Sequence, residues 1–106
     1  MIDSDRSIEV TLLYFDGCPH WLEADAHLRL LADELSGVHL SRQIVDTPEE
    51  AERMSFRGSP SILVNGVDPF AEANDPVGLS CRVYQTPDGP AGSPTLEQFR
   101  EALRGE

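Results

Sequence analysis

Apolar and polar residues along the chain are arranged in blocks that predict short strands alternating with helices. Residues 8–15 are mainly β-branched, aromatic and leucine side chains and end at Asp16-Gly17, as is typical of a buried strand. Residues 19–35 carry apolar side chains at helical spacing instead, and they predict an amphipathic helix that ends at Ser36-Gly37. The apolar face of this helix holds Trp21, Ala24, Leu28, Leu31 and Leu35, and its polar side holds Glu23, Asp25, Arg29 and Asp33.

The middle of the chain predicts a second strand, a second helix and a third strand. Residues 38–45 partly alternate between apolar and polar and predict a strand. Thr47-Pro48-Glu49-Glu50 then marks a helix start, because it supplies a cap, a proline for the first position and the glutamate of a capping box. We expect this helix to run to about Phe56 and to stop at Gly58. Residues 61–64 predict a short buried strand closed by Asn65-Gly66.

The last third begins with an irregular stretch, residues 67–80, that is too long for a tight hairpin turn. Residues 81–85 predict a fourth strand, residues 86–90 a turn, and Ser93-Pro94 the cap and first position of a last helix. The order β-α-β-α-β-β-α implies a parallel strand pair joined by a right-handed crossover. We therefore predict one α/β domain over residues 1–106, with a central mixed four-stranded sheet and helices on both faces.

Composition narrows the range of functions. The 106-residue chain has a net charge of −11, and all eight of its positive side chains are arginine. A basic surface for nucleic acid is therefore not expected, because the phosphate backbone would be repelled. No signal-peptide pattern is visible and no apolar run reaches the length of a membrane span, so we expect a cytoplasmic protein without membrane partners. The lack of lysine beside frequent alanine, arginine and glycine is typical of GC-rich bacterial genomes.

The most reactive position in the sequence is Cys18, in the run Cys18-Pro19-His20-Trp21 between the first strand and the first helix. The free N–H groups and the positive dipole end of a first helical turn stabilise a thiolate there. Pro19 suits the first helical position, and His20 adds a positive charge when it is protonated. Trp21 stands where a dithiol site would carry its second cysteine. The sequence therefore indicates a single exposed thiol, or a thiol whose partner comes from elsewhere.

Cys81 has two interpretations. In a simple hairpin, the start of the fourth strand lies far from the end of the sheet that carries Cys18, so Cys81 would be a buried core residue, the interpretation we favour. The long segment before it could instead fold across the sheet end and bring Cys81 to Cys18, which requires Cα atoms within roughly 7 Å. His27 and His39 are expected to be structural or surface residues without the spacing of a metal site, so we predict no metal and no cofactor.

The chain resembles a thioredoxin-fold protein over nearly its whole length, and two local motifs carry the match. Cys18-Pro19-His20 is similar to the first three residues of the redox motif in bacterial DsbA-type oxidases. Residues 56–66, Phe-Arg-Gly-Ser-Pro-Ser-Ile-Leu-Val-Asn-Gly, resemble the thioredoxin and DsbA segment in which Gly-Thr-Pro-Thr precedes the third strand. The resemblance implies a cis bond before Pro60, facing the thiol, and a backbone at Ser59 that pairs with an extended substrate.

The chain also departs from this family. Trp21 replaces the resolving cysteine, and the first strand lacks the buried carboxylate that thioredoxins keep. We expect Trp21 to pack on the helix face rather than to serve as a substrate platform. The candidate catalytic residues are Cys18, His20 and Cys81, and the candidate substrate-binding residues are Pro19, Trp21, Ser59 and Pro60.

Three functions agree with these residues. The first is a monothiol thiol–disulfide oxidoreductase, in which Cys18 attacks a disulfide or glutathione adduct and an external thiol or Cys81 resolves the product. Its partners would be thiol or disulfide compounds, either proteins or small molecules. The second is a non-catalytic module that binds a peptide or small ligand beside Ser59-Pro60 and Trp21. The third is metal or mercury handling by Cys18 and Cys81, although the motifs of the longer organomercurial lyases are absent.

Overall fold

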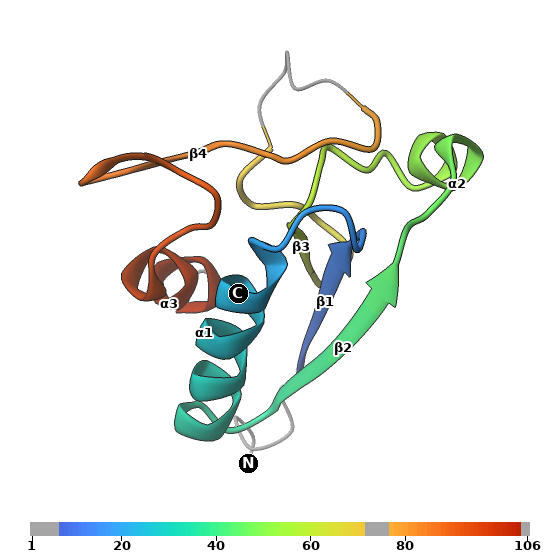
Figure 1. Ribbon diagram of the computed structural model, residues 1–106. Helices are drawn as coiled ribbons and strands as arrows, with labels where there is room; N and C mark the ends of the chain where they lie inside the picture. The colour runs from blue at the N-terminus through green and yellow to red at the C-terminus, as the bar shows by residue number, and fades with distance from the viewer. Residues whose placement is uncertain (1–6, 72–76, 105–106) are drawn as a thin grey trace.

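The central sheet places strand β1 between β2 and β3 (Figure 1). The computed structural model describes residues 7–71 and 77–104. β1 (Ile8–Tyr14) pairs in parallel with β2 (Val38–Ile44) and antiparallel with β3 (Ser61–Val64). Helix α1 (Trp21–Glu34) connects the two parallel strands. The α/β class, the parallel first pair and the mixed sheet are therefore confirmed.

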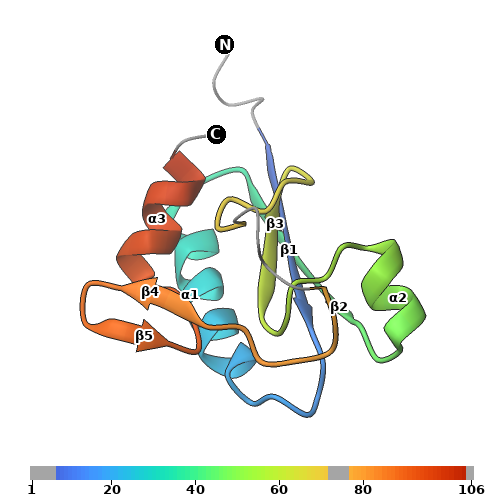
Figure 2. The same ribbon diagram turned by 90° about the horizontal axis from the view of Figure 1, so that it is seen from above.

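Helices lie on both faces of this sheet, as Figure 2 shows from above. α1 and α3 (Leu96–Arg104) pack on one face, against alternate residues of β1 and β3. The short helix α2 (Pro48–Arg53) packs on the other face, where Leu13 meets Ala51 and Phe56. The main core cluster consists of Val10, Leu12, Ala24, Leu28, Leu31, Ile62, Val64, Phe99 and Leu103. Because strand side chains alternate between faces, β1 supplies Val10 and Leu12 to one cluster and Leu13 to the other.

The predicted helix start at Thr47-Pro48 is confirmed, whereas the starts predicted for the other two helices are corrected. Pro19 is not the first helical residue, because α1 begins at Trp21 after the N-cap residue His20, which makes no side-chain capping bond. Thr47 caps α2, since its hydroxyl accepts a hydrogen bond from the Glu50 amide at 3.1 Å. The predicted cap Ser93 is wrong: α3 is capped by Thr95, whose hydroxyl accepts from the Gln98 amide at 3.1 Å. The Gln98 side chain accepts from the Thr95 amide in return, at 2.9 Å, which completes a capping box.

The predicted fourth strand does not join the central sheet, which contains three strands within the described ranges. Instead, β4 (Tyr84–Thr86) pairs with β5 (Gly89–Ala91) in a separate hairpin. The turn predicted at residues 86–90 explains this difference, because it is tight enough to bring β5 back onto β4. The Thr86 hydroxyl donates to the Gly89 carbonyl at 2.6 Å, and Gly89 adopts a φ of +109°. The backbone of Tyr84–Thr86 therefore pairs locally and not with β3.

Asp25 is a further correction, because this carboxylate, expected on the polar side of α1, is buried. Arg42 of β2 donates hydrogen bonds to it, and Arg29, one helical turn on, lies 3.2 Å away. The hydrogen bond that Arg42 donates to the Asp25 carboxylate raises the pKa of Arg42. A buried carboxylate is tolerated at this position because two guanidinium groups neutralise it.

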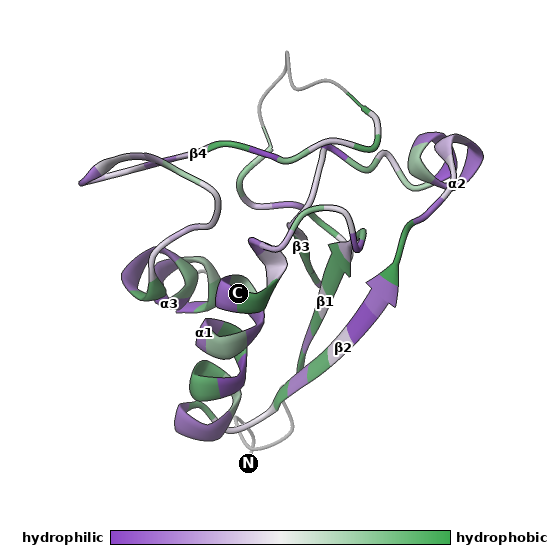
Figure 3. Cartoon of the chain, in the orientation of Figure 1, coloured by the Kyte–Doolittle hydropathy of each residue, from purple (hydrophilic) through white to green (hydrophobic). Residues whose placement is uncertain are grey.

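Polar residues dominate the second half of β2, which forms one edge of the sheet (Figure 3). Polar side chains on an edge strand disfavour pairing with another chain. Within residues 7–71 and 77–104, the helices are too short and too polar to cross a bilayer. The expectations for the N-terminal residues 1–6, and for residues 72–76 of the irregular stretch, lie outside the described residues.

Candidate functional site

A disulfide joins Cys18 to Cys81 across 63 residues of sequence, with their Cα atoms 5.8 Å apart. Cys18 lies in the loop between β1 and α1, and Cys81 lies just before β4. Neither cysteine of the chain is free. The partner of Cys18 therefore comes from a distant segment, as the second interpretation of Cys81 anticipated. The core position favoured for Cys81 is wrong, because the residue is exposed.

The two cysteines differ sharply in burial. Cys18 has 0% of its surface exposed, whereas Cys81 belongs to the exposed residues of the chain. The expectation of an exposed Cys18 therefore does not hold in this disulfide-bonded structure. The carbonyl oxygen of Ser59 lies 3.6 Å from the Cys18 Sγ, and Cys81 is bonded to the same sulfur. The loop before β3 and the segment around Cys81 thus enclose Cys18 from two sides.

Residues 80–82, here called the crossing segment, pair with Ser59 in the manner of a short parallel strand. The Ser59 amide donates to the Ser80 carbonyl at 2.7 Å, and the Arg82 amide donates to the Ser59 carbonyl at 3.0 Å. The resemblance to thioredoxins implied that an extended substrate would pair with this backbone. In this structure, a segment of the same chain occupies it.

Gly58 makes this close approach sterically feasible. It has a φ of +107°, which side-chain-bearing residues rarely adopt. A Cβ atom at this position would lie 3.0 Å from the Ser80 carbonyl oxygen and 3.1 Å from the Arg82 Cβ. The crossing segment therefore lies directly against the backbone of residue 58, and a larger residue there would push it away.

Ser59 and Pro60 are both buried at the start of β3. The peptide bond between them is cis, which confirms that expectation. The Ser59 hydroxyl accepts a hydrogen bond from the Phe15 amide at 3.3 Å and so ties the loop before β3 to the end of β1. The carbonyl of Ser59 faces Cys18 because both backbone and side chain of this residue are held.

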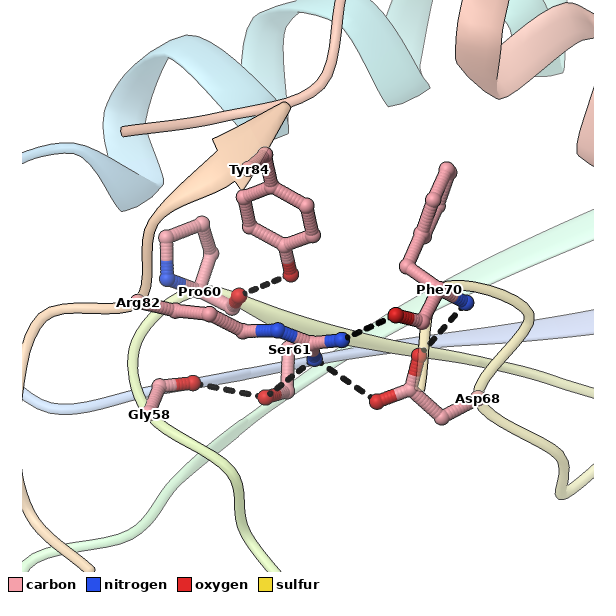
Figure 4. A network of polar contacts seen from close by, with 7 residues as sticks. All are labelled: Gly58, Pro60, Ser61, Asp68, Phe70, Arg82 and Tyr84. Atoms are coloured by element: carbon pink, nitrogen blue, oxygen red, sulfur yellow. Dashed lines mark hydrogen bonds and ion pairs between the residues drawn. The ribbon is translucent and has the colours of Figure 1, made fainter. Parts of the chain in front are cut away.

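A buried polar network anchors the residues that follow Cys81 (Figure 4). The Arg82 guanidinium forms an ion pair with Asp68 at 2.7 Å, and each side chain is only 6% exposed. It also donates to the Phe70 carbonyl at 2.8 Å and to the Ser61 hydroxyl at 3.2 Å. The Ser61 hydroxyl in turn donates to the Gly58 carbonyl at 2.6 Å. The guanidinium is thus satisfied by several acceptors, as a buried charge requires.

Tyr84 adds a second anchor from the same segment. Its hydroxyl donates to the Pro60 carbonyl, and its ring lies under the Arg82 guanidinium, 4.6 Å from ring centroid to carbon. Phe70 packs edge-on against the Tyr84 ring at 5.5 Å. Arg82 and Tyr84 together hold the chain on either side of residue 83 against the start of β3. Cys81 is therefore positioned by noncovalent contacts as well as by its disulfide.

The residues after Cys18 lead into α1. His20 is the residue before the helix, and the helix N-terminus receives no side-chain capping bond. The His20 imidazole is exposed and lies against the backbone of Gly92, where any Cβ would collide with the ring. Pro19 is exposed beside it, and its carbonyl accepts from the Leu22 amide at 3.1 Å. The positive end of the α1 dipole therefore lies close to Cys18, with no side chain bonded at the cap and one carboxylate, that of Glu23, in the first turn.

Trp21 packs against other side chains, as expected. Its ring stacks on Tyr14 with centroids 4.2 Å apart and planes inclined by 25°. It also packs against the main core cluster. The contacts of Trp21 are thus those of a packing residue between the end of β1 and the start of α1.

Sequence reasoning did not identify Gly58, Asp68, Arg82 and Tyr84 as residues of this site. Arg82 and Tyr84 alternate with Cys81 and Val83, so a strand pattern would assign the polar arginine to solvent and the valine to the core. The structure does the reverse: Arg82 is buried and Val83 is 64% exposed. The one available signal was an arginine in a short apolar run, combined with an aspartate in the preceding loop.

Neither metal sites nor known families add to this description. Within residues 7–71 and 77–104, no three histidine, cysteine or acidic side chains gather as a metal-binding group. The chain matches no protein-family model, and comparison with curated proteins also yields no match. The Cys18–Cys81 site is therefore the feature of the chain that points to a function.

Proposed function

We propose that this chain is a thiol–disulfide oxidoreductase whose redox centre is the Cys18–Cys81 pair. One observation carries the proposal: a cysteine beside an uncapped helix N-terminus is disulfide-bonded to an exposed cysteine. In the oxidised form the pair accepts two electrons from a dithiol, which becomes a disulfide while Cys18 and Cys81 become thiols. The reduced pair carries out the reverse reaction on a disulfide substrate.

The noncovalent contacts of the residues next to Cys81 support repeated cycles of reduction and oxidation. Arg82 is held by Asp68, and Tyr84 by the Pro60 carbonyl, so neither anchor depends on the disulfide. The Ser59 backbone also binds the crossing segment through two hydrogen bonds. Reduction would therefore leave the two thiols close together, which raises the effective concentration of one at the other and favours renewed disulfide formation.

The arrangement supports a thioredoxin-like fold with a smaller central sheet. The strand–helix–strand unit, the cysteine before α1 and the Ser59-Pro60 loop beside it agree with that family. The three-stranded central sheet, the separate hairpin and Trp21 depart from it. We therefore propose that Cys81 supplies the second sulfur that the motif itself lacks.

The crossing segment bears on the alternative of a non-catalytic peptide-binding module. A peptide that paired with the Ser59 backbone would have to displace residues 80–82, which already use its amide and carbonyl. This occupation favours the redox function over the binding module.

Soft-metal handling is a second candidate, favoured by the 5.8 Å separation of the two Cα atoms. In the reduced protein, two thiolates at this separation could ligate one soft ion such as Cu⁺ or Hg²⁺. Titration of the reduced protein with either ion would then give a one-to-one complex that Cys18→Ser and Cys81→Ser each weaken strongly. Unchanged binding in both variants would contradict this candidate.

The redox proposal is tested by equilibrating the protein in defined thiol–disulfide buffers and counting free thiols by alkylation. We expect two thiols to appear together, at a potential above about −300 mV, below which structural disulfides of secreted proteins lie. The reduced protein should also convert oxidised glutathione to two thiols, and Cys18→Ser and Cys81→Ser should each prevent renewed formation of the internal disulfide. Ser80→Ala is the matched control and should behave like wild type. A pair that stays oxidised at all potentials down to about −300 mV is a structural cross-link, and this result would contradict the proposal.

A further inference from the structure

We infer that incoming thiols attack the Sγ of Cys81, and that Cys18 is the sulfur that leaves. This inference rests on the proposed redox function and assigns separate roles within the pair. It reverses the role expected from the sequence, in which Cys18 meets the substrate. Cys81 would form the intermolecular disulfide, and Cys18 would be the internal thiol.

Access along the line of attack favours Cys81 over Cys18. In thiol–disulfide exchange, the entering, central and leaving sulfurs lie nearly in line, so the attacking thiolate approaches from the side opposite the leaving sulfur. A thiolate that attacks Cys81 approaches a residue that is exposed to solvent. For attack on Cys18, the thiolate would have to approach a side chain with 0% exposure, against which the Ser59 carbonyl already lies at 3.6 Å. Access therefore selects Cys81.

The neighbours of Cys81 in the sequence fix its exposed position. Residues 81–84 alternate: Arg82 and Tyr84 are buried, while Cys81 and Val83 are exposed. Successive side chains of an extended chain point to opposite sides. Because Arg82 and Tyr84 are held by Asp68 and Pro60, Cys81 is kept on the opposite, solvent side.

Cys18 is also the better leaving group of the two cysteines. Exchange is faster when the leaving thiol has a lower pKa. Cys18 lies just before the N-terminus of α1, which lacks a side-chain cap, so the helix dipole favours the charge that develops on its sulfur. Cys81 lies in no helix and has no such stabilisation.

The resulting reaction is balanced. A thiolate of a dithiol donor attacks the Cys81 Sγ, the donor–Cys81 disulfide forms, the Cys18–Cys81 bond breaks, and its electron pair leaves on Cys18. The second thiolate of the donor then attacks its own bonded sulfur and releases Cys81 as a thiolate. The donor is oxidised to a disulfide, and Cys18 and Cys81 are reduced and take up protons from solvent. With a monothiol such as glutathione, a second molecule performs the second attack.

The test is to identify which cysteine bears the first adduct. Oxidised wild-type protein is exposed briefly to reduced glutathione and quenched with acid, the released thiol is alkylated with a maleimide, and peptides are mapped by mass spectrometry. We expect glutathione on Cys81 and the maleimide on Cys18 in at least tenfold excess over the reverse pattern. The reverse pattern, or an even distribution, would overturn the inference while leaving the redox function intact. A native protein that forms no adduct and stays oxidised would contradict the redox function itself.

Denaturant supplies the control for burial. In concentrated urea the two sulfurs are equally accessible, so the excess of Cys81 adduct should fall to less than threefold. An excess that is unchanged in urea would show that local sequence, and not the fold, directs the attack, and this would overturn the structural argument. Asp68→Asn in the folded protein is a second probe, because weaker anchoring of Arg82 should reduce the preference for Cys81. If the preference in this folded variant equals that of wild type, the anchoring argument fails.

Discussion

The guanidinium of Arg82 and the carboxylate of Asp68 form an ion pair at 2.7 Å in which both side chains are almost completely buried. Arg82 directly follows the exposed Cys81 in the sequence, and its ion pair with Asp68 connects the crossing segment to the loop after β3. It links a polar interaction inside the protein to the position of an exposed cysteine. The same pair accounts for the burial of an arginine within an apolar run.

Removal of one member of this pair should destabilise the protein strongly. Arg82→Met leaves the Asp68 carboxylate buried without its partner, and we expect a loss of about 3–5 kcal/mol in the free energy of unfolding. Urea unfolding of the oxidised protein measures this loss. The double variant Arg82→Met with Asp68→Asn is the control and should lose less, because no charge remains unpaired. Equal losses in the single and double variants would contradict this account of the pair.

Substitution of Gly58 should disturb the crossing segment. Gly58→Ala introduces a Cβ against the Ser80 carbonyl and imposes a positive φ on alanine, so we expect a loss of about 1–3 kcal/mol. Gly66→Ala is the matched control, since Gly66 has a φ of +86° but no atom within 4 Å of the added Cβ. Unfolding of both variants in urea separates the two effects. If Gly66→Ala lowers the free energy of unfolding as much as Gly58→Ala does, the contact between the added Cβ and the crossing segment contributes nothing to the loss.

Reduction of the disulfide should lower stability by an amount that rises with the logarithm of the length of the closed loop. Cross-linking residues 63 positions apart restricts the unfolded chain by an amount worth about 4 kcal/mol in the loop-entropy description. We therefore expect urea unfolding to shift to lower concentration in the presence of a thiol reductant. The double variant Cys18→Ser with Cys81→Ser should show no such shift. A reduced protein as stable as the oxidised one would indicate that the cysteines remain restrained in the unfolded state.

The ion pair between α1 and α3 should make stability depend on pH. Arg100 donates hydrogen bonds to Glu34 and lowers the pKa of this carboxyl below its ordinary value of 4.5. Because the folded-state pKa is lowered, the contribution of Glu34 is fully present above pH 4.5 and is lost as the pH falls through the folded-state value. Arg100→Gln should therefore reduce stability near neutral pH and differ less from wild type in acid. Denaturant unfolding across pH 2–7 tests this, and a difference that is constant with pH would exclude the linkage.

Local structure was predictable wherever neighbouring residues decide it. The strand at residues 61–64 is observed with those bounds, and α1 and α2 begin within two residues of their predicted starts. The tight turn at residues 86–90 was also predictable, but its consequence was not. Whether the strand before it joins the central sheet or folds back into a hairpin depends on distant contacts, and here the local pairing prevails.

The sequence by itself determined the strand–helix–strand order and a cysteine at the start of the first helix, because hydrophobic periodicity and capping residues act over a few neighbouring positions. Only the tertiary structure decided the partner of Cys18 and which of the two cysteine residues is exposed. These depend on Asp68, which draws Arg82 inward, and on Ser59, which pairs with the crossing segment. Such contacts join residues far apart in the chain, and no periodic pattern records them.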